Sequence, residues 1–327
     1  MLNPEQTRQI QAAADILNRG GVVAFPTETV YGLGADASNP DAVRRIFAIK
    51  GRPADHPLIV HIGQASDLDA WAREIPDGAR RLAERFWPGP LTLILLRHPH
   101  VPDVVTGGQD TVGLRMPGHP LALALLHEMG PGKGLAAPSA NHFGRISPTT
   151  AEHVRMELGE AVDMILDGGA CRVGLESTII SFADGAPVLL RPGGITVAEL
   201  EEALDRRIST PEEARSTVRA PGMLASHYAP STPLEIWRSE ELPQRVRELV
   251  ARGQRVVVLE QSDLPLPYGD NLTCCIMPVQ APAYAHNLYA TLRRLDAAGF
   301  DRILAEAPPD TGEWQAVNDR LRRASAT

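Results

Sequence analysis

Short apolar runs alternate with amphipathic segments between residues 20 and 208, and this alternation limits the possible folds more than any other feature. Runs such as residues 22–25, 91–96 and 111–115 have the length of buried strands. Segments such as residues 40–49 repeat their apolar side chains with helical spacing. This pattern is typical of an α/β domain, which we expect in residues 1–208.

The end of this first domain carries the clearest local signals. Apolar residues at 177–182 and 187–190 flank a turn at Asp184 and Gly185, which predicts a β-hairpin. Thr196 is followed three residues later by Glu199, a capping box that predicts a helix from there to about residue 207.

The periodicity is lost in residues 209–232, which contain several prolines and predict an interdomain linker. Beyond it, residues 233–327 again alternate strand-length and helix-length segments. This arrangement predicts a smaller, Rossmann-like αβ domain with a parallel sheet.

Composition excludes several classes of protein. The net charge of −8 argues against tight, sequence-independent binding to nucleic acid. Apolar runs stay well short of the roughly 20 residues that span a bilayer, and the N-terminus lacks the pattern of a signal peptide, so we expect a cytoplasmic protein without a membrane span. The three cysteines contain no C-x-x-C pair, which favours reduced thiols and no structural metal.

Common catalytic signatures are missing from the sequence. The segment GPGKG at residues 130–134 resembles a phosphate loop, but Lys133 is followed by glycine and the residue six before it is His127. Motifs of α/β-hydrolases, zinc proteases and dinucleotide-binding proteins do not occur.

Four other segments place polar residues directly after apolar strands, where α/β proteins build their sites. The first is PTETVYGLG at residues 26–34, where Thr29 and neighbouring side chains offer hydroxyls and Glu28 a carboxylate. Gly32 and Gly34 would allow a ligand to approach the backbone closely. A tight strand-to-helix turn is the alternative interpretation.

The second segment is KGRPADHPLIVH at residues 50–61. Lys50 and Arg52 follow a predicted helix, so a favourable interaction with the helix dipole would explain them. His56 and His61, which bracket the next strand, exceed what helix capping needs and favour an anion site.

The third and fourth segments lie farther along the chain. Arg115 ends an apolar strand and is followed later by Ser139 and Asn141; a surface ion pair and a helix-start loop are the alternatives. Ser177 and Arg191 lie on the two predicted hairpin strands and would point into one cavity.

Taken in order, PTETVYGLG, KGRP, SAN, STII and LRPG resemble the YrdC-type domain of the threonylcarbamoyl-AMP synthase family. The segment PGMLASHYAP at residues 221–230 and the domain that follows it are similar to the long, two-domain form. The resemblance covers essentially the whole chain. It implies a YrdC-like twisted mixed sheet with flanking helices in the first domain.

The resemblance also implies an activity. Members of this family are nucleotidyltransferases that convert L-threonine, bicarbonate and ATP to L-threonylcarbamoyladenylate, pyrophosphate and water. A downstream threonylcarbamoyl transferase complex then modifies the tRNA adenosine next to the anticodon. We expect weak or absent direct tRNA binding, and Mg2+ accompanying ATP without assigned protein ligands.

The resemblance further implies roles for individual residues. Lys50 near the phosphates and Arg52 would be catalytic. The expected ATP contacts are Arg52, His56, Thr111, Ser139, Asn141, Ser147, Arg191 and Tyr228. The expected threonine contacts are Thr29, His61, Arg115 and Ser177, with Arg115 suited to bidentate pairing with the carboxylate.

Some alternatives remain open at this point. His227 and Tyr228 either anchor the second domain or belong to a lid over the nucleotide. The chain could also be an RNA-binding module without ATP turnover, which the charge disfavours. A related carbamoyl-transfer enzyme of the hydrogenase-maturation type is disfavoured by the absence of cysteine pairs.

Overall fold

The computed structural model describes residues 2–267 and 269–326, which divide into two compact units. The first unit holds the chain up to Phe143 together with Ser147–Met223, and the second holds Gly144–Ile146 and the chain from Leu224 onward. The segment expected to be a linker is thus shared, with residues 209–223 in the first unit and 224–232 in the second.

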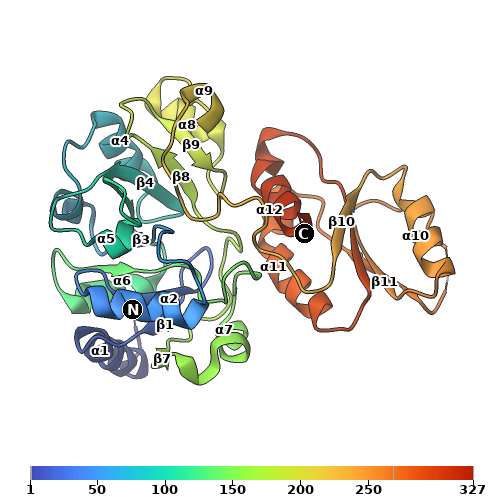
Figure 1. Cartoon of the computed structure of the whole chain (residues 1–327), viewed down its shortest axis with the longest axis horizontal. Coiled ribbons are helices and arrows are strands. Elements are labelled where there is room, and N and C mark those ends of the chain that lie inside the picture. Colours follow the sequence, from blue (N-terminus) through green and yellow to red (C-terminus); the bar gives the residue numbers. More distant parts are fainter. Residues whose placement is uncertain (1, 268, 327) are drawn as a thin grey trace. The chain divides into compact units, whose positions relative to one another are not determined.

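The first unit is built on a mixed sheet that has nine strands among the described residues (Figure 1). Its strands, in their order across the sheet, are β7 (Met164–Ile165), β1 (Val23–Phe25), β2 (Gly32–Asp36), β6 (Gly134–Ala136), β3 (Ile59–Ile62), β5 (Thr111–Arg115), β4 (Leu91–Leu96), β8 (Thr178–Ser181) and β9 (Val188–Arg191). Strands β3 and β5 are parallel, whereas β4 and β5 are antiparallel. The predicted mixed α/β fold is confirmed.

Helices flank this sheet, and all of them except α9 (Pro211–Ala214) bury apolar side chains. They are α1 (Pro4–Asn18), α2 (Pro40–Lys50), α3 (Leu68–Trp71), α4 (Asp77–Phe86), α5 (Asp103–Thr106), α6 (Pro120–Met129), α7 (Ala151–Leu158), α8 (Val197–Leu204) and α9 (Pro211–Ala214). In α2, for example, Val43, Ile46 and Phe47 are buried in the main apolar core. The helix ends at Gly51, whose φ of +61° lets the chain turn toward β3.

The two glycines of residues 26–34 lie in a strand. Gly32 and Gly34 belong to β2, which pairs antiparallel with β1. A Cβ atom on Gly34 would lie 2.7 Å from the Phe25 ring. These glycines therefore make room for a core aromatic ring of the neighbouring strand. The alternative of a strand-to-helix turn is wrong, and the close approach of a ligand stays a prediction.

The second unit contains a sheet whose four strands, within the part of the chain that is described, are all parallel. Their order is β10 (Leu234–Trp237), β13 (Arg302–Glu306), β11 (Val256–Glu260) and β12 (Leu272–Ile276). Helices α11 (Ala281–Asp296) and α12 (Gln315–Ser325) lie on one side of it and α10 (Leu242–Ala251) on the other (Figure 1). The parallel sheet predicted for this part of the chain is confirmed.

The cysteines are free and differ in exposure: Cys171 of the first unit is buried, Cys274 of the second unit is exposed, and its neighbour Cys275 is intermediate. Among the described residues, no helix combines the length and apolar character that crossing a bilayer requires.

Candidate active site

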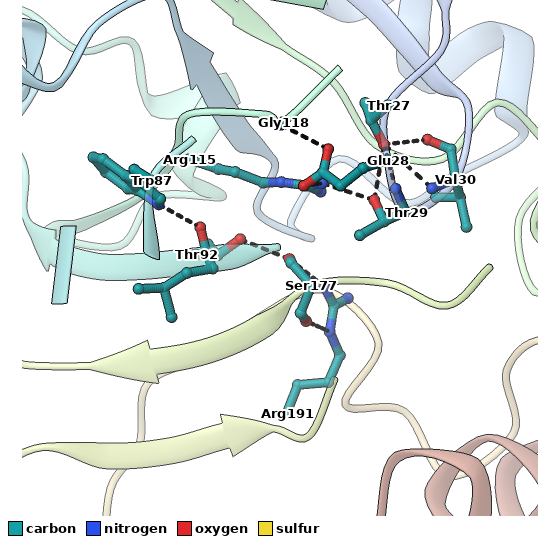
Figure 2. Close-up of polar contacts among 11 residues, drawn as sticks. Thr27, Glu28, Thr29, Val30, Trp87, Thr92, Arg115, Gly118, Ser177 and Arg191 are labelled. Carbon is teal, nitrogen blue, oxygen red and sulfur yellow. Dashed lines mark hydrogen bonds and ion pairs between the residues drawn. The ribbon is translucent and has the colours of Figure 1, made fainter. Parts of the chain in front are cut away.

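Arg115 is the centre of a buried polar cluster at the end of β5 (Figure 2). Its Nη2 atom donates to Glu28 Oε1 at 2.7 Å and to Thr29 Oγ1 at 2.8 Å. Glu28 Oε2 accepts from the backbone N–H of Gly118 at 2.8 Å. The Arg115 and Glu28 side chains are only 5% and 2% exposed, so this ion pair is shielded from water. The alternative of a surface ion pair is wrong.

His61 stands directly beside Arg115, because β3 and β5 are parallel and the two residues are paired in register. Burial, and then the Arg115 charge, lower the His61 pKa to about 3, so its imidazole is neutral near pH 7. The buried atoms His61 Nδ1 and Arg115 Nε have no hydrogen-bond partner among the described residues. Buried polar atoms are normally satisfied, so this pair marks a place for a polar ligand.

Ser177 and Arg191 are also in contact, as expected from the predicted hairpin. Arg191 Nη2 donates to Ser177 Oγ at 3.1 Å, and Arg191 Nε donates to the Ser177 carbonyl at 3.0 Å (Figure 2). Ser177 Oγ lies 2.7 Å from Thr92 Oγ1 of the adjacent strand β4. The hairpin thus holds a second guanidinium–hydroxyl pair, formed by two residues that were predicted to bind different substrates.

Lys50 is the last residue of α2, and its ammonium bonds to a loop that is distant in sequence. Its ammonium donates to the carbonyl oxygens of Ser139, at 2.6 Å, and Asn141. The side chain therefore fixes the loop that carries both predicted ATP contacts. Burial, and then the neighbouring Arg52 charge, hold the Lys50 pKa well below its ordinary value.

Arg52 and His56 lie on the turn that follows α2. Arg52 Nη2 donates to the Pro57 carbonyl at 2.9 Å, and its guanidinium carbon is 5.6 Å from the centre of the Phe143 ring. The His56 ring packs edge-on against the same Phe143 ring. Burial, and then Arg52, lower the His56 pKa. Lys50, Arg52 and His56 thus offer hydrogen-bond donors from neighbouring positions along the chain.

The remaining predicted contacts of the first unit are more dispersed. Ser147 Oγ donates to Glu176 Oε1 at 2.5 Å, and both residues are buried. Thr111 begins β5, whereas Arg115 ends it. At ~3.3 Å per residue, roughly 13 Å separates them along the strand. Thr111 therefore does not belong to the cluster around Arg115.

Comparisons with known proteins agree with this arrangement of motifs. Residues 15–193 match the Sua5_yciO_yrdC family, described as "Telomere recombination". Residues 195–326 match the family described as the C-terminal domain of threonylcarbamoyl-AMP synthase. A threonylcarbamoyl-AMP synthase of Pyrococcus abyssi is 44% identical, over 97% of this chain and 94% of that protein. The chain belongs to the threonylcarbamoyl-AMP synthase family.

Two further relatives support membership of this synthase family over the full two-domain length. The threonylcarbamoyl-AMP synthase of Bacillus subtilis is 46% identical over 97% of this chain and 93% of that protein. A crystal structure of P. abyssi Sua5 complexed with L-threonine has a TM-score of 0.88 and 42% identity, covering 98% of this chain and 94% of that one. The chain is thus an enzyme of the nucleotidyl-transfer type.

Two acidic residues of these polar contacts were not predicted from the sequence. Glu28 was noted only as a carboxylate and received no role, yet it is the ion-pair partner of Arg115. Glu176, which precedes Ser177, received no attention, yet it bonds to Ser147. A buried arginine needs a counter-charge, and this is the signal that could have pointed to Glu28.

Two other segments discussed above have contacts of their own. Tyr228 belongs to the second unit, where its ring is 5.7 Å from that of Tyr289 and 5.2 Å from the guanidinium carbon of Arg320. Its contact with ATP stays a prediction. In the segment GPGKG, Gly132 N–H donates to the Asp67 carboxylate, and Lys133 pairs with Asp36 at 3.4 Å. Because these contacts already engage the Gly132 N–H and the Lys133 ammonium, the segment does not have the arrangement of a phosphate-binding loop.

Proposed function

We propose that this chain makes L-threonylcarbamoyladenylate. The amine of L-threonine and bicarbonate give a carbamate and water. A carbamate oxygen then attacks the α-phosphorus of ATP, and pyrophosphate leaves. The observation that carries this proposal is the buried pair of unpartnered nitrogens, His61 Nδ1 and Arg115 Nε, in a member of the synthase family.

The amino-acid end of the proposed site lies around Arg115, with Thr29, His61 and Ser177 as the other threonine contacts. The guanidinium offers a positive charge to the threonine carboxylate, and neutral His61 offers a hydrogen bond without adding a second charge. Both Nη2 protons are already used on Glu28 and Thr29. Bidentate pairing with the carboxylate therefore requires one of these partners to move, whereas Nε is available at once.

The nucleotide end of the proposed site lies around Lys50 and Arg52. Nucleotidyl transfer needs positioning and neutralisation of phosphate charge more than it needs a side-chain nucleophile. A buried ammonium without a carboxylate partner among the described residues suits that task. The other proposed ATP contacts are His56, Thr111, Ser139, Asn141, Ser147, Arg191 and Tyr228.

Other parts of the proposal concern partners. Mg2+ would arrive with the triphosphate, and within the described residues no three acidic, histidine or cysteine side chains group as metal ligands. The product would pass to a separate threonylcarbamoyl transferase complex that modifies tRNA. Direct tRNA binding, which the negative net charge disfavours, and a cytoplasmic location stay predictions.

The decisive measurement is pyrophosphate release by the purified full chain. We expect release only when ATP, L-threonine and bicarbonate are all present, and product analysis should show the threonylcarbamoyl adenylate. Lys133→Ala is a control that should match the wild type, because Lys133 pairs with Asp36 away from the cluster. Equal pyrophosphate release without threonine would contradict the proposal.

A further inference from the structure

Residues 209–223, the first half of the predicted linker, pack onto the sheet of the first unit. The Ser209 carbonyl accepts from the backbone N–H of Leu189 in β9 at 3.0 Å, and α9 lies beside the same strand (Figure 1). Ala220 is buried in an apolar cluster with side chains of β3, β4, β8 and β9, and Met223 packs against that cluster. This part of the chain is therefore fixed to the sheet at several points.

Arg219 extends from this segment to two loops of the first unit. Its Nη1 atom donates to the Asp55 carbonyl at 3.0 Å, and its Nη2 atom donates to the Gly107 carbonyl at 2.9 Å. Its backbone N–H donates to Gln109 Oε1 at 2.7 Å, and its own carbonyl accepts from Gln109 Nε2 at 3.1 Å. Gln109 thus fixes the backbone of Arg219, and the guanidinium joins the turn after α2 to the end of α5.

The turn between α2 and β3 is packed closely against the end of α5. Gly107, which follows α5, has a φ of +61°, and a Cβ atom there would lie 2.3 Å from the Asp55 carbonyl oxygen. The N–H of Leu58, just before β3, donates to the Val105 carbonyl of α5 at 2.8 Å. The Asp55 carbonyl therefore has little room to shift while it is also bonded to Arg219.

This turn carries two of the proposed ATP contacts, Arg52 and His56. Asp55 directly precedes His56 in the chain. The side chains of Arg52 and His56 both lie against the Phe143 ring. Burial lowers the His56 pKa most, and the Arg52 charge lowers it further. Asp55 raises this pKa, whereas the Arg219 charge again lowers it, so Arg219 is close enough to influence His56.

A third proposed ATP contact, Arg191, is held by the same segment. Its Nη1 atom donates to the Pro221 carbonyl at 3.0 Å, and its other two nitrogens bond to Ser177. Pro221 comes two residues after Arg219. The segment therefore reaches the nucleotide end both through a side chain and through a backbone carbonyl.

We infer that Arg219 is a positioning residue for the nucleotide end of the site. It fixes the turn that carries Arg52 and His56, and it does so through two backbone carbonyls, without a contact of its own to ATP. Contacts that are already in place lower the cost of ordering a site when its ligand binds. This inference rests on the proposed function, since it takes Arg52 and His56 as ATP contacts.

The test is calorimetric titration of the full chain with ATP and, separately, with L-threonine. Arg219→Met keeps the length of the side chain but removes both donors. We expect it to weaken ATP binding about ten-fold and threonine binding less than about two-fold. Arg219→Lys keeps the charge, but a single ammonium lacks the planar fork that serves two carbonyls, so ATP binding should still weaken by about three-fold or more.

Arg255→Met is the matched control in the second unit. Arg255 is also exposed, its Nη1 atom donates to the Gly299 carbonyl at 3.0 Å, and its backbone N–H donates to Asp301 Oδ2 at 2.8 Å. The same truncation should leave both affinities unchanged there. If the loss of such a contact acted only through stability, the two methionine variants would behave alike.

The outcomes separate this inference from the proposed function. Unchanged ATP affinity in folded Arg219→Met protein overturns the inference, as do equal losses for ATP and threonine. Normal ATP affinity in Arg219→Lys, with a loss in Arg219→Met, also overturns it, because the charge alone would then be responsible. If Arg219→Met fails to fold, Arg219→Lys decides the matter. Wild-type protein that binds ATP but releases no pyrophosphate contradicts the synthase proposal alone, and wild-type protein that binds no ATP overturns both.

Discussion

Two buried cations of the first unit, Arg115 and Lys50, are compensated in different ways. Arg115 forms an ion pair with Glu28, so its charge is balanced by the protein itself. Lys50 has only the partial charges of two carbonyl oxygens as hydrogen-bond partners among the described residues. The charge of Arg115 is therefore balanced by the protein itself, whereas Lys50 has no carboxylate partner among the described residues; under the proposed function, phosphate would supply it.

Breaking the ion pair should have the largest effect. Arg115→Met leaves the Glu28 carboxylate buried without its counter-charge, and we expect a loss of about 3 to 5 kcal/mol in the free energy of unfolding. Urea denaturation measures this loss. Adding Glu28→Gln to the same chain should recover part of the stability, and a double variant no more stable than Arg115→Met would contradict the balance of charges described above.

Removing the other cation should affect catalysis more than folding. Lys50→Met deletes a desolvated charge together with its carbonyl contacts, so we expect a change in unfolding free energy below about 2 kcal/mol. Pyrophosphate release should fall on the order of a hundred-fold, because phosphate charge is no longer neutralised. A stability loss as large as that of Arg115→Met, with normal turnover, would reverse the comparison.

The burial of His61 beside Arg115 should make the stability of the protein depend on pH. The pKa of His61 is about 3 in the folded chain and near the ordinary 6.5 when unfolded, so the unfolded state binds more protons between these values. Stability should therefore fall as the pH drops below about 6.5. Relative to His61→Gln, the wild type should lose on the order of 3 kcal/mol between pH 7 and pH 4. Parallel pH profiles of unfolding free energy would refute this.

The smallest effect is expected at the second lysine of the chain. Lys133 is 44% exposed and pairs with Asp36. Exposed ion pairs contribute little, so Lys133→Ala should cost about 0.5 kcal/mol or less. ATP affinity, measured by calorimetry, should stay unchanged; a clear loss would show that GPGKG does contact phosphate.

Local signals in the sequence predicted the elements whose ends are capped or whose turns are distinctive. The capping box at Thr196 and Glu199 opens α8, although the helix ends at Leu204 because Asp205 adopts a left-handed conformation. The hairpin of β8 and β9 is also confirmed. Strand β2 was not predicted, because two of its five residues are glycines, which weaken the pattern of a strand. Both glycines lie against the Phe25 ring.

The site was less predictable than the fold because its contacts are distant in sequence. Glu28 and Arg115 are 87 residues apart, and Lys50 and Ser139 are 89 apart. Spacing and periodicity describe neighbours along one element, so they do not reveal such pairs. The motifs indicated which residues matter, whereas the contacts between them required coordinates.

The burial of Cys171 gives the protein a built-in kinetic probe. Burial raises the pKa of this thiol to about 12, so alkylating reagents find almost no thiolate at neutral pH while the first unit stays closed. Cys274 and Cys275 lie in the second unit and are more accessible. Timed alkylation followed by mass spectrometry therefore follows transient opening of the first unit through Cys171, without any engineered label.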